Sequence, residues 1–569
     1  MKKLIQYIKR FADNQHCLFF LFWIGFSIPN FFLAFTEPIT VYTKICSIVF
    51  AMSFFLLMMT LAKRPGKMFW WLFVFVFFNA FQLVLLDLFG EAVVAVDMFL
   101  NAVTTNPTEA TELLTNLFPV VPIVVVFYVT LMVLAVVSVR NKHTLELKFI
   151  HTTRRIARRG FAVSILMILV NYYINPTFQF WLDIYPANVS YNFALSFERY
   201  FRIKNYHNTS ADYTFDAHST HPTDSAETYV FLIGETSRAA NYGIYGYNRP
   251  TTPHLQQMKD ELCIFRDALT QSNTTHKSVP MLLSAACAED FDQIYGKKSM
   301  ISAFKEVGFK TSFLSNQLPN GSFIDFFGQE ADTCVFVKNN AQPGENLSDD
   351  LLLDLLKKRL ADKSKKKFIV LHLYGSHFNY LERYPAKDAY FKPDDATKAD
   401  VTNRQNLVNA FDNSIRYTDN FIYKVIQLVQ AQHTKSTVIF TSDHGEDIYD
   451  DDRKRFLHAS PSPTFYQVYV PYIIWMSPEY TAAYPQKKAH AQRNLNKPLA
   501  TSIVTYHTML SIAGINTKDF NIHNSLVDSV FVSNPRNYLT DHNQPTPMNV
   551  VIRHRYDIEQ FKQRGLRLP

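Results

Sequence analysis

The sequence predicts a five-helix transmembrane bundle joined to an extracytoplasmic α/β domain, in which helices flank a mainly parallel sheet. Apolar stretches of membrane-spanning length fill most of the first third of the 569 residues. After residue 228, short β-branched and aromatic runs alternate with amphipathic stretches, a pattern typical of parallel strands joined by helices. We therefore expect a membrane domain at 1–176, interfacial helices and a linker at 177–227, and an α/β domain at 228–569.

Five apolar stretches are each close to the ~20 residues that cross a bilayer as a helix. They cover residues 17–36, 41–62, 68–89, 118–139 and 161–176. The N-terminal tail, the turn at 63–67 and the loop at 142–159 are rich in lysine and arginine, which assigns them to the cytoplasm. With five spans, everything after residue 176 is then expected on the outer side of the membrane.

The loop at 91–117 contains acidic residues but no lysine or arginine, as expected for the side of the membrane opposite the basic loops. Asn101, Thr105 and Glu109 are spaced four apart, so on a helix they project from nearly one face. A carboxylate and two hydrogen-bonding groups are suited to binding an ammonium group. On spacing alone, a solvated amphipathic loop is the better interpretation.

Strand-like runs after residue 228 outline the predicted sheet. They are residues 228–233, 311–314, 368–373, 437–440 and 472–475, and a helix is predicted at 351–360. The preceding segment, 177–227, is polar but rich in aromatic residues that suit a membrane interface. The net charge of +8 is modest and arises largely from the basic loops, so we do not expect a nucleic-acid partner.

Candidate metal ligands follow two of these strands. The sequence Ser-Asp-His-Gly-Glu at 442–446 puts Asp443 and His444 just after the run at 437–440, and Glu235 follows the run at 228–233. The carboxyl ends of parallel strands meet at one edge of a sheet, where α/β proteins bind ligands. Carboxylate and imidazole groups together suit a divalent cation, whereas an isolated Asp-His pair is more often an ordinary turn.

A candidate nucleophile lies in a polar, hydroxyl-rich segment at 271–280, just before an apolar run. A threonine alkoxide is scarce at neutral pH unless a metal or a base lowers the pKa of the hydroxyl. Glu235, Asp443 and His444 could lower this pKa, either by holding a metal or by accepting the proton. Taken alone, any threonine here is a surface or capping residue, and the segment offers both Thr274 and Thr275.

Several motifs, in this order, resemble those of the membrane-bound phosphoethanolamine transferases of Gram-negative envelopes. That family includes the lipid A-modifying enzymes of polymyxin and colistin resistance, and it belongs to the alkaline phosphatase and sulfatase superfamily. The matching segments are Gly-Glu-Thr-Ser-Arg at 234–238, Tyr-Gly-Tyr-Asn-Arg-Pro-Thr-Thr-Pro at 245–253, Ser-Val-Pro at 278–280, Gly-Ser-His at 375–377, Ser-Asp-His-Gly-Glu at 442–446 and Leu-His at 457–458.

The resemblance implies the roles of the site residues. It selects Thr275, five residues before the proline of Ser-Val-Pro, as the nucleophile. The implied metal ligands are Glu235, Thr275, Asp443 and His444, with one zinc ion expected, a second open, and manganese less favoured. His377 and His458 would bind phosphoryl oxygens, ligate a second metal or carry protons. Asn101, Thr105 and Glu109, at the family's spacing, would bind the donor's ammonium group.

The resemblance also implies an activity and a location. The chain is expected to transfer phosphoethanolamine from phosphatidylethanolamine to a lipopolysaccharide acceptor, lipid A or a core sugar, through a covalent intermediate on Thr275. It would be a multi-pass protein of the bacterial inner membrane, act as a monomer and hold its catalytic domain in the periplasm.

Two alternatives remain open at this point. A phosphoglycerol transferase acting on an envelope glycan would use a similar anchor, metal and threonine, although Glu109 suits an ammonium group better than a neutral glycerol. A non-catalytic envelope-binding protein is the other alternative. A simple sulfatase or phosphodiesterase is less favoured, because hydrolysis needs no membrane bundle beside the site.

The sequence departs from the family in two respects. Gln271 and Met281 stand where many relatives have a cysteine pair around the nucleophile, so packing or metal must hold that segment instead. The cysteines outside the predicted spans are three, Cys263, Cys287 and Cys334, and allow at most one disulfide among them. A lysine that some lipid A-modifying members carry has no clear counterpart near 316–320, which leaves the acceptor open.

Overall fold

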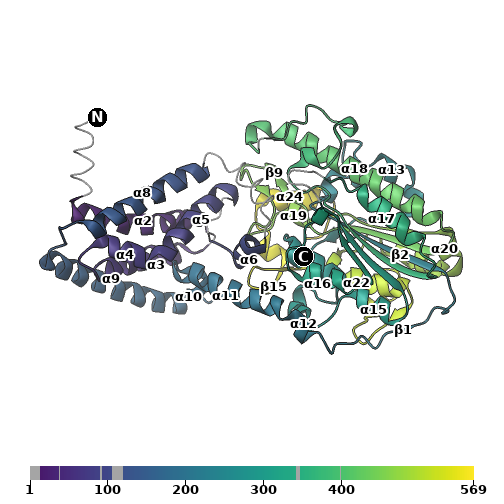
Figure 1. Ribbon diagram of the computed structural model, residues 1–569, viewed down its shortest axis with the longest axis horizontal. Coiled ribbons are helices and arrows are strands. Elements are labelled where there is room, and N and C mark those ends of the chain that lie inside the picture. Colours follow the sequence, from purple (N-terminus) through teal and green to yellow (C-terminus); the bar gives the residue numbers. More distant parts are fainter. Residues whose placement is uncertain are drawn as a thin grey trace. The chain divides into compact units, whose positions relative to one another are not determined.

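The computed structural model describes residues 13–37, 39–89, 93–104, 120–340, 347–397 and 399–568. The chain divides into two compact units, each described here by itself (Figure 1). The first unit contains Met1–Ala102 and Thr111–Glu198, and the second contains Val103–Ala110 and Arg199–Pro569. The domain boundaries expected from the sequence, after residues 176 and 227, stay a prediction.

The first unit is helical. Its helices are α2 (Gln15–Thr36), α3 (Val41–Met59), α4 (Pro65–Trp71), α5 (Phe73–Phe89), α6 (Val96–Thr104), α8 (Val120–Arg140), α9 (Leu147–Ile174) and α10 (Phe180–Asp183), and α11 (Ala187–Lys204) continues into the second unit. Aromatic side chains fill its interior; Phe26 stacks on Phe55 with ring centroids 5.2 Å apart. Close-packed phenylalanines therefore join helices that are apolar over most of their circumference.

Three helices of the described chain, α2, α3 and α8, are long and apolar enough to cross a membrane. The pair α4 and α5, bent by 70°, adds a fourth if it forms one broken span. A helical membrane region is thus confirmed, and among the described residues three or four helical segments qualify as spans where the sequence predicts five. The fifth predicted stretch forms the second half of α9, whose first half carries arginines, so the apolar part is shorter than the ~20 residues of a span.

A seven-stranded sheet forms the centre of the second unit. In spatial order its strands are β3 (Leu262–Phe265), β11 (Tyr472–Met476), β8 (Lys435–Ser442), β2 (Glu227–Gly234), β7 (Lys366–His372), β5 (Lys310–Ser315) and β6 (Thr333–Phe336). All pairs from β8 to β6 are parallel, whereas β11 is antiparallel to both of its neighbours. The mainly parallel sheet expected from the sequence is confirmed.

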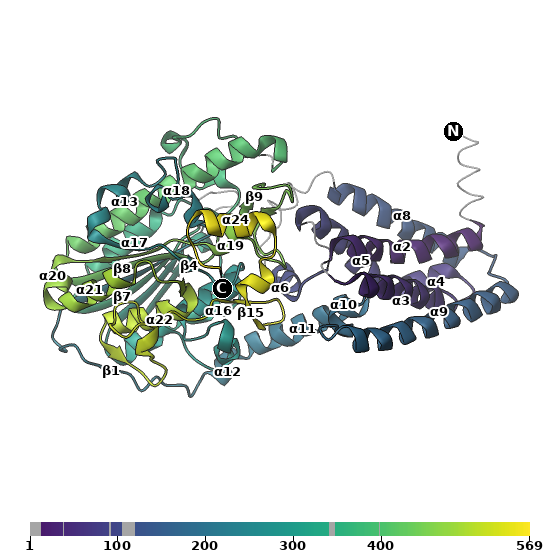
Figure 2. The same cartoon turned by 180° about the vertical axis from the view of Figure 1, so that it is seen from behind.

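Helices cover both faces of this sheet (Figures 1 and 2). Helices α14 (Thr275–Leu283), α15 (Met300–Glu306), α16 (Phe323–Gln329) and α22 (Thr501–Ile512) contribute to one apolar core, and α13 (Pro253–Gln257), α17 (Leu351–Leu360) and α18 (Arg404–Gln430) to the other. Along β2, Tyr229, Phe231 and Ile233 enter the first core, and Val230 and Leu232 enter the second. Because both faces are buried, the strand reads in the sequence as a continuous apolar run.

Shorter elements complete the second unit. They are α12 (Tyr206–Thr209), α19 (Phe465–Val468), α20 (Pro478–Ala483), α21 (Pro485–Asn494), α23 (Met548–Val551), α24 (Arg555–Gln563), β1 (His218–Ser219), β4 (Ala268–Leu269), β9 (Asp447–Ile448), β10 (Phe456–Leu457), β12 (Leu499–Ala500), β13 (Ile515–Asn516), β14 (Asn537–Leu539) and β15 (Pro545–Pro547). All five cysteines are free thiols. The second unit is therefore held by packing and not by cross-links.

Candidate active site and metal centre

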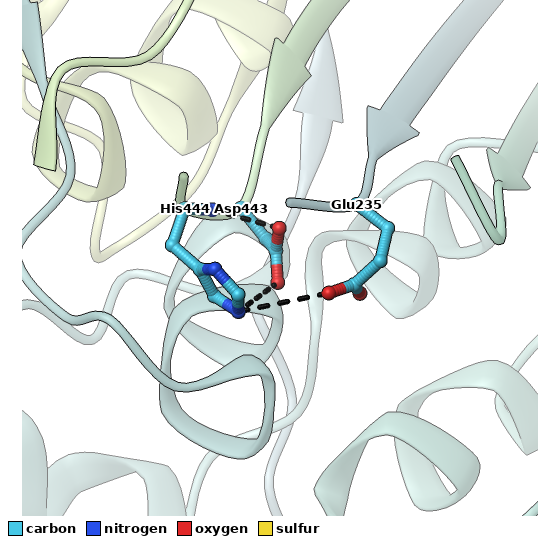
Figure 3. A group of neighbouring side chains, drawn as sticks. All are labelled: Glu235, Asp443 and His444. Carbon is cyan, nitrogen blue, oxygen red and sulfur yellow. Dashed lines mark hydrogen bonds and ion pairs between the residues drawn. The ribbon is translucent and has the colours of Figure 1, made fainter. Parts of the chain in front are cut away.

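The carboxyl edge of the sheet brings the predicted ligands together (Figure 3). The register pairs Gly234 at the end of β2 with Ser442 at the end of β8. Glu235, Asp443 and His444 leave these two strands side by side, and their candidate ligand atoms all lie within 4.8 Å of one another. All three side chains are at most 1% exposed. Strand register therefore explains why residues more than 200 positions apart share one site.

Thr275 completes this cluster as the first residue of α14. Its Oγ1 lies 3.2 Å from Glu235 Oε1 and 3.0 Å from His444 Nε2. The hydroxyl of Thr274 instead lies 3.0 Å from Ser272 Oγ. The two threonines that the sequence offered are thus distinguished by geometry, and only Thr275 faces the acidic pair. Its place at a helix N-terminus favours negative charge on the hydroxyl oxygen.

The orientation of His444 suits metal binding. Its Nδ1 lies 2.9 Å from the carbonyl oxygen of Gly445, which can only accept, so Nδ1 carries the proton. The Nε2 lone pair then faces Asp443 Oδ2 at 3.2 Å and Glu235 Oε1 at 3.6 Å. A histidine fixed by a backbone carbonyl in this way is common at metal sites. Burial lowers the pKa of His444 well below its usual range, which keeps the ring neutral.

The two carboxylates fit a cation between them. Burial raises the pKa of both Glu235 and Asp443, and the nearby Asp443 raises that of Glu235 further. Two buried carboxyl groups this close disfavour joint ionisation unless a positive charge offsets them. Oxygen and imidazole donors at this spacing fit a divalent ion such as zinc. The residues present therefore fit the expected metal.

Neighbouring groups hold the carboxylates in place. Asp443 Oδ1 accepts the backbone N–H groups of Thr236 and His444, at 3.1 and 2.7 Å. Glu235 accepts the Thr236 hydroxyl at 2.8 Å and the Gln317 amide at 2.9 Å. Thr236 has a φ of +59°, in the left-handed region that is costly for a β-branched residue. The strained turn after β2 thus places the Thr236 N–H within hydrogen-bond distance of Asp443.

Gln317 is a site residue that was not predicted from the sequence. The Gln317 side chain donates to Glu235 and also to the carbonyl of Leu373, at 3.0 Å, which joins the ends of β5 and β7. The one available signal was its position just past the carboxyl end of a predicted strand. Amide side chains are common in such loops, so that signal alone does not separate it from a turn residue.

His377 and His458 lie beside the cluster. The rings of His444 and His458 have centroids 4.2 Å apart, and His377 and His458 are 6.1 Å apart. His377 Nδ1 donates to the carbonyl of Phe378 at 2.7 Å, so its Nε2 also keeps a lone pair. Burial, and to a lesser degree His458, lowers the pKa of His377. His458 Nδ1 approaches Glu446 Oε2 at 3.5 Å.

Gly375, in the Gly-Ser-His segment, occupies a position where a side chain does not fit. Gly375 has a φ of +52°, and a Cβ at this position would lie 2.7 Å from the carbonyl oxygen of Glu235. The Ser376 N–H also donates to that oxygen, at 3.0 Å. A side chain at residue 375 would therefore displace the backbone that carries a candidate ligand.

The predicted donor-binding residues cannot be placed against this site. Thr105 and Glu109 lie outside the described residues. Asn101 belongs to α6, but its side chain also lies outside what the structure describes. Their role in recognising an ammonium group stays a prediction.

Comparison with known proteins agrees with the fold and the motifs. A family model described as Sulfatase matches residues 227–515, which is half of the chain and includes every candidate metal ligand. The chain belongs to the sulfatase family. Among its curated relatives are phosphoethanolamine transferases, as the motifs indicated.

The curated relatives of this sulfatase-family chain match its second unit. The Kdo(2)-lipid A phosphoethanolamine 7''-transferase of Escherichia coli K12 is 32% identical over 329 residues, 56% of each chain. The phosphoethanolamine transferase EptA of Escherichia coli O157:H7 is 26% identical over 298 residues, 51% of this chain and 53% of that one. The chain therefore aligns with about half the length of the curated relatives that it matches.

Solved structures extend the likeness to the first unit. The integral membrane lipooligosaccharide phosphoethanolamine transferase A of Neisseria meningitidis has a TM-score of 0.67 at 21% identity, over 88% of this chain and 98% of that chain. The C-terminal periplasmic domain of EptC from Escherichia coli, in complex with Zn, has a TM-score of 0.55 at 21% identity, over 60% and 98%. A helical membrane region followed by a sulfatase-like α/β domain is thus the fold of both this chain and the Neisseria protein.

Proposed function

We propose that this chain transfers phosphoethanolamine from phosphatidylethanolamine to a lipopolysaccharide acceptor, through a covalent intermediate on Thr275. The observation that carries the proposal is the position of the Thr275 hydroxyl, within 3.2 Å of Glu235 and 3.0 Å of His444 in a buried candidate metal site. A hydroxyl in this setting is an activated nucleophile. Relatives whose names specify phosphoethanolamine transfer match the same half of the chain.

In the first step the Thr275 hydroxyl gives its proton to Glu235, which accepts it at 3.2 Å. The Thr275 oxygen bonds to the phosphorus of the donor, and the bond from phosphorus to the diacylglycerol oxygen breaks. Zinc held by Glu235, Thr275, Asp443 and His444 would lower the pKa of the hydroxyl and offset charge on the phosphoryl group. The departing diacylglycerol oxygen takes a proton. We assign this proton to His458, whose ring centroid lies 4.2 Å from that of His444.

In the second step an acceptor oxygen attacks the same phosphorus, the bond to Thr275 breaks, and the Thr275 oxygen takes back a proton from Glu235. His377 suits the role of base, because its lowered pKa keeps it neutral and its Nε2 lone pair is free of the Phe378 contact. The product is a phosphoethanolamine ester of the acceptor. Lipid A and a core sugar are both compatible with this chemistry.

Zinc is the proposed ion for two reasons. The ligand set mixes oxygen and imidazole donors, and the solved domain of EptC from Escherichia coli is titled as a complex with Zn. Manganese suits such a mixed set less well. The proximity of His377 and His458 leaves room in the proposal for a second ion. We further propose an inner-membrane location with the second unit in the periplasm, and a monomeric state.

Phosphoglycerol transfer remains the competing enzymatic proposal. The described residues of the site suit chemistry at phosphorus, and none of them distinguishes an ethanolamine head group from glycerol. A non-catalytic envelope-binding protein is the other alternative. It is less favoured because none of the candidate ligands, nucleophile or neighbouring histidines is missing or turned away.

Intact mass spectrometry of the purified full chain tests the proposal. After incubation with zinc and phosphatidylethanolamine, the wild type should gain the mass of one phosphoethanolamine group, and Thr275→Ala should gain none. Thr274→Ala is the matched control and should be modified like the wild type, because that hydroxyl faces Ser272.

Other outcomes would contradict the proposal. A wild type modified only by phosphatidylglycerol would establish phosphoglycerol transfer. An adduct that survives Thr275→Ala would overturn the nucleophile, and no adduct with either lipid would favour the non-catalytic alternative.

A further inference from the structure

An arginine-lined pocket lies next to the loop that carries Asp443 and His444. The pocket has a volume of about 350 Å³, and its wall includes Arg238, Arg249, Arg404 and Arg564. We call it the arginine pocket. Its lining residues Arg238, Tyr247 and Arg249 belong to the motifs at 234–238 and 245–253, and the proposed chemistry gives these three residues no role.

The arginine pocket carries excess positive charge. Asp450, an acidic residue in its wall, is shared between Arg238 at 2.7 Å and Arg404 at 3.1 Å. Arg249 pairs with Asp412 at 2.6 Å. No acidic group lies within 4.0 Å of the Arg564 guanidinium in the part of the chain that the structure describes. Four arginines against two aspartates leave a net charge of +2 among these six side chains, because Arg238 and Arg404 share one aspartate.

The guanidinium groups are held in fixed positions. Arg238 lies over the Tyr466 ring at 4.3 Å, and Arg249 lies over the Phe391 ring at 3.9 Å. Arg404 donates to the backbone carbonyl of Tyr449 at 2.7 Å. Planar donors fixed in this way lose little freedom on binding, and they match the oxygens of phosphate and carboxylate groups.

The first turn of α18 also favours an anionic ligand in the arginine pocket. Arg404 and Gln405 from that turn line the pocket. The N-terminus of a long helix favours negative charge. Helix and side chains therefore select the same class of ligand.

The pocket and the candidate metal site share one loop. Arg238 donates to the carbonyl of Glu446 at 3.1 Å, two residues after His444. A Cβ at Gly445 would lie 2.8 Å from Arg238 Cβ and 2.1 Å from the carbonyl oxygen of Tyr466. The pocket wall thus packs directly against the backbone that presents the candidate ligands.

We propose that the arginine pocket binds an oxyanion group, phosphate or carboxylate, of the saccharide acceptor. This inference rests on the proposed function, because a lipopolysaccharide saccharide carries both groups. Binding of one such group would anchor the acceptor beside the loop that bears Asp443 and His444, while another of its oxygens receives phosphoethanolamine. The net charge of +2 matches a dianionic phosphate best.

Calorimetric titration of the zinc-loaded full chain tests the pocket, with glucosamine 1-phosphate and glucuronate as probes. The double variant Arg404→Gln, Arg564→Gln removes two charges at partly exposed positions and avoids the buried Arg238. We expect it to bind the preferred probe roughly tenfold more weakly than the wild type. Arg555→Gln is the matched control, because Arg555 lies on helix α24, its side chain is 91% exposed and it pairs with Glu559.

The steady-state KM for the acceptor gives a second readout. It should rise about tenfold in the double variant, and equal melting temperatures would show that the fold is intact. Stronger binding of glucosamine 1-phosphate would identify phosphate as the anchored group, and stronger binding of glucuronate would identify a sugar acid. An unchanged probe affinity together with an unchanged acceptor KM overturns the inference. Adduct formation on wild-type Thr275, measured in parallel, reports separately on the proposed function.

Discussion

Among single residues, Gln317 is expected to set the affinity for the metal without ligating it. Its amide holds one oxygen of Glu235 at 2.9 Å and anchors itself on the carbonyl of Leu373. Loss of such a supporting group costs about 10–100-fold in metal affinity. Zinc competition with a chromophoric chelator should therefore show at least tenfold weaker binding for Gln317→Ala. Gln293→Ala removes a similar amide bond, to Ala285, and should leave the affinity unchanged.

Gly445 should tolerate no side chain. A Cβ there would lie 2.1 Å from the Tyr466 carbonyl oxygen, so the loop that carries His444 would have to move. We expect Gly445→Ala to lower both zinc affinity and the melting temperature. Gly296→Ala is the comparison, because its nearest neighbour would be at 3.9 Å, an ordinary contact. Equal stability of the two variants would show that the loop adapts freely.

Site residues could be predicted from the sequence only where they directly follow a recognisable strand. Asp443 and His444 are adjacent to the end of a readable strand, as Glu235 is, so a parallel sheet brings them together. The choice between Thr274 and Thr275 needed either the family resemblance or the three-dimensional structure, because the two are neighbours at the start of the same helix. Gln317 reaches Glu235 across β7, a contact that no local pattern encodes.

At the scale of elements, buried strands were the easiest to predict, and their directions the hardest. The predicted runs at 437–440 and 472–475 are both strands, but the second, β11, runs antiparallel to the first. An apolar run indicates that a strand is buried, whereas the direction of the strand depends on the connection that leads to it. The fifth predicted stretch is not a helix of its own, because α9 joins it to a preceding basic stretch in a single helix.

Helix α22 contains a group that should make the second unit sensitive to acid. His507 accepts the Asn521 backbone N–H on Nδ1 at 3.1 Å, and burial lowers its pKa to about 4 from 6.5. The folded-state pKa lies below the unfolded value, so this stabilising contribution is complete above about pH 6.5 and is lost as the pH falls toward 4. The loss amounts to about 3 kcal/mol.

The melting temperature of the full chain between pH 7 and 4.5 would measure this effect. His507→Gln should be less stable at pH 7 but lose less on acidification than the wild type. His523→Gln, at an exposed position in the adjoining segment, should follow the wild-type curve. Parallel curves for the wild type and His507→Gln would assign the acid sensitivity to other groups.

At the scale of the whole molecule, the chain combines two compact units with separate interiors. The candidate metal site lies wholly within the second unit, where two buried carboxylates face one another. Zinc bound only to the folded second unit would stabilise it by mass action, by about 2.7 kcal/mol at a free concentration 100 times the dissociation constant. The first unit gains nothing from the ion.

Scanning calorimetry of the full chain should therefore show a transition that moves to lower temperature on chelation and returns with zinc, beside one that stays fixed. Asp443→Asn keeps the shape of the side chain but removes a charged ligand, so its transitions should respond little to zinc. A single transition that moves as a whole would mean that the two units unfold together. If chelation moves neither transition in the wild type, the buried cluster holds no structural zinc, and its carboxylates must be balanced by protonation instead.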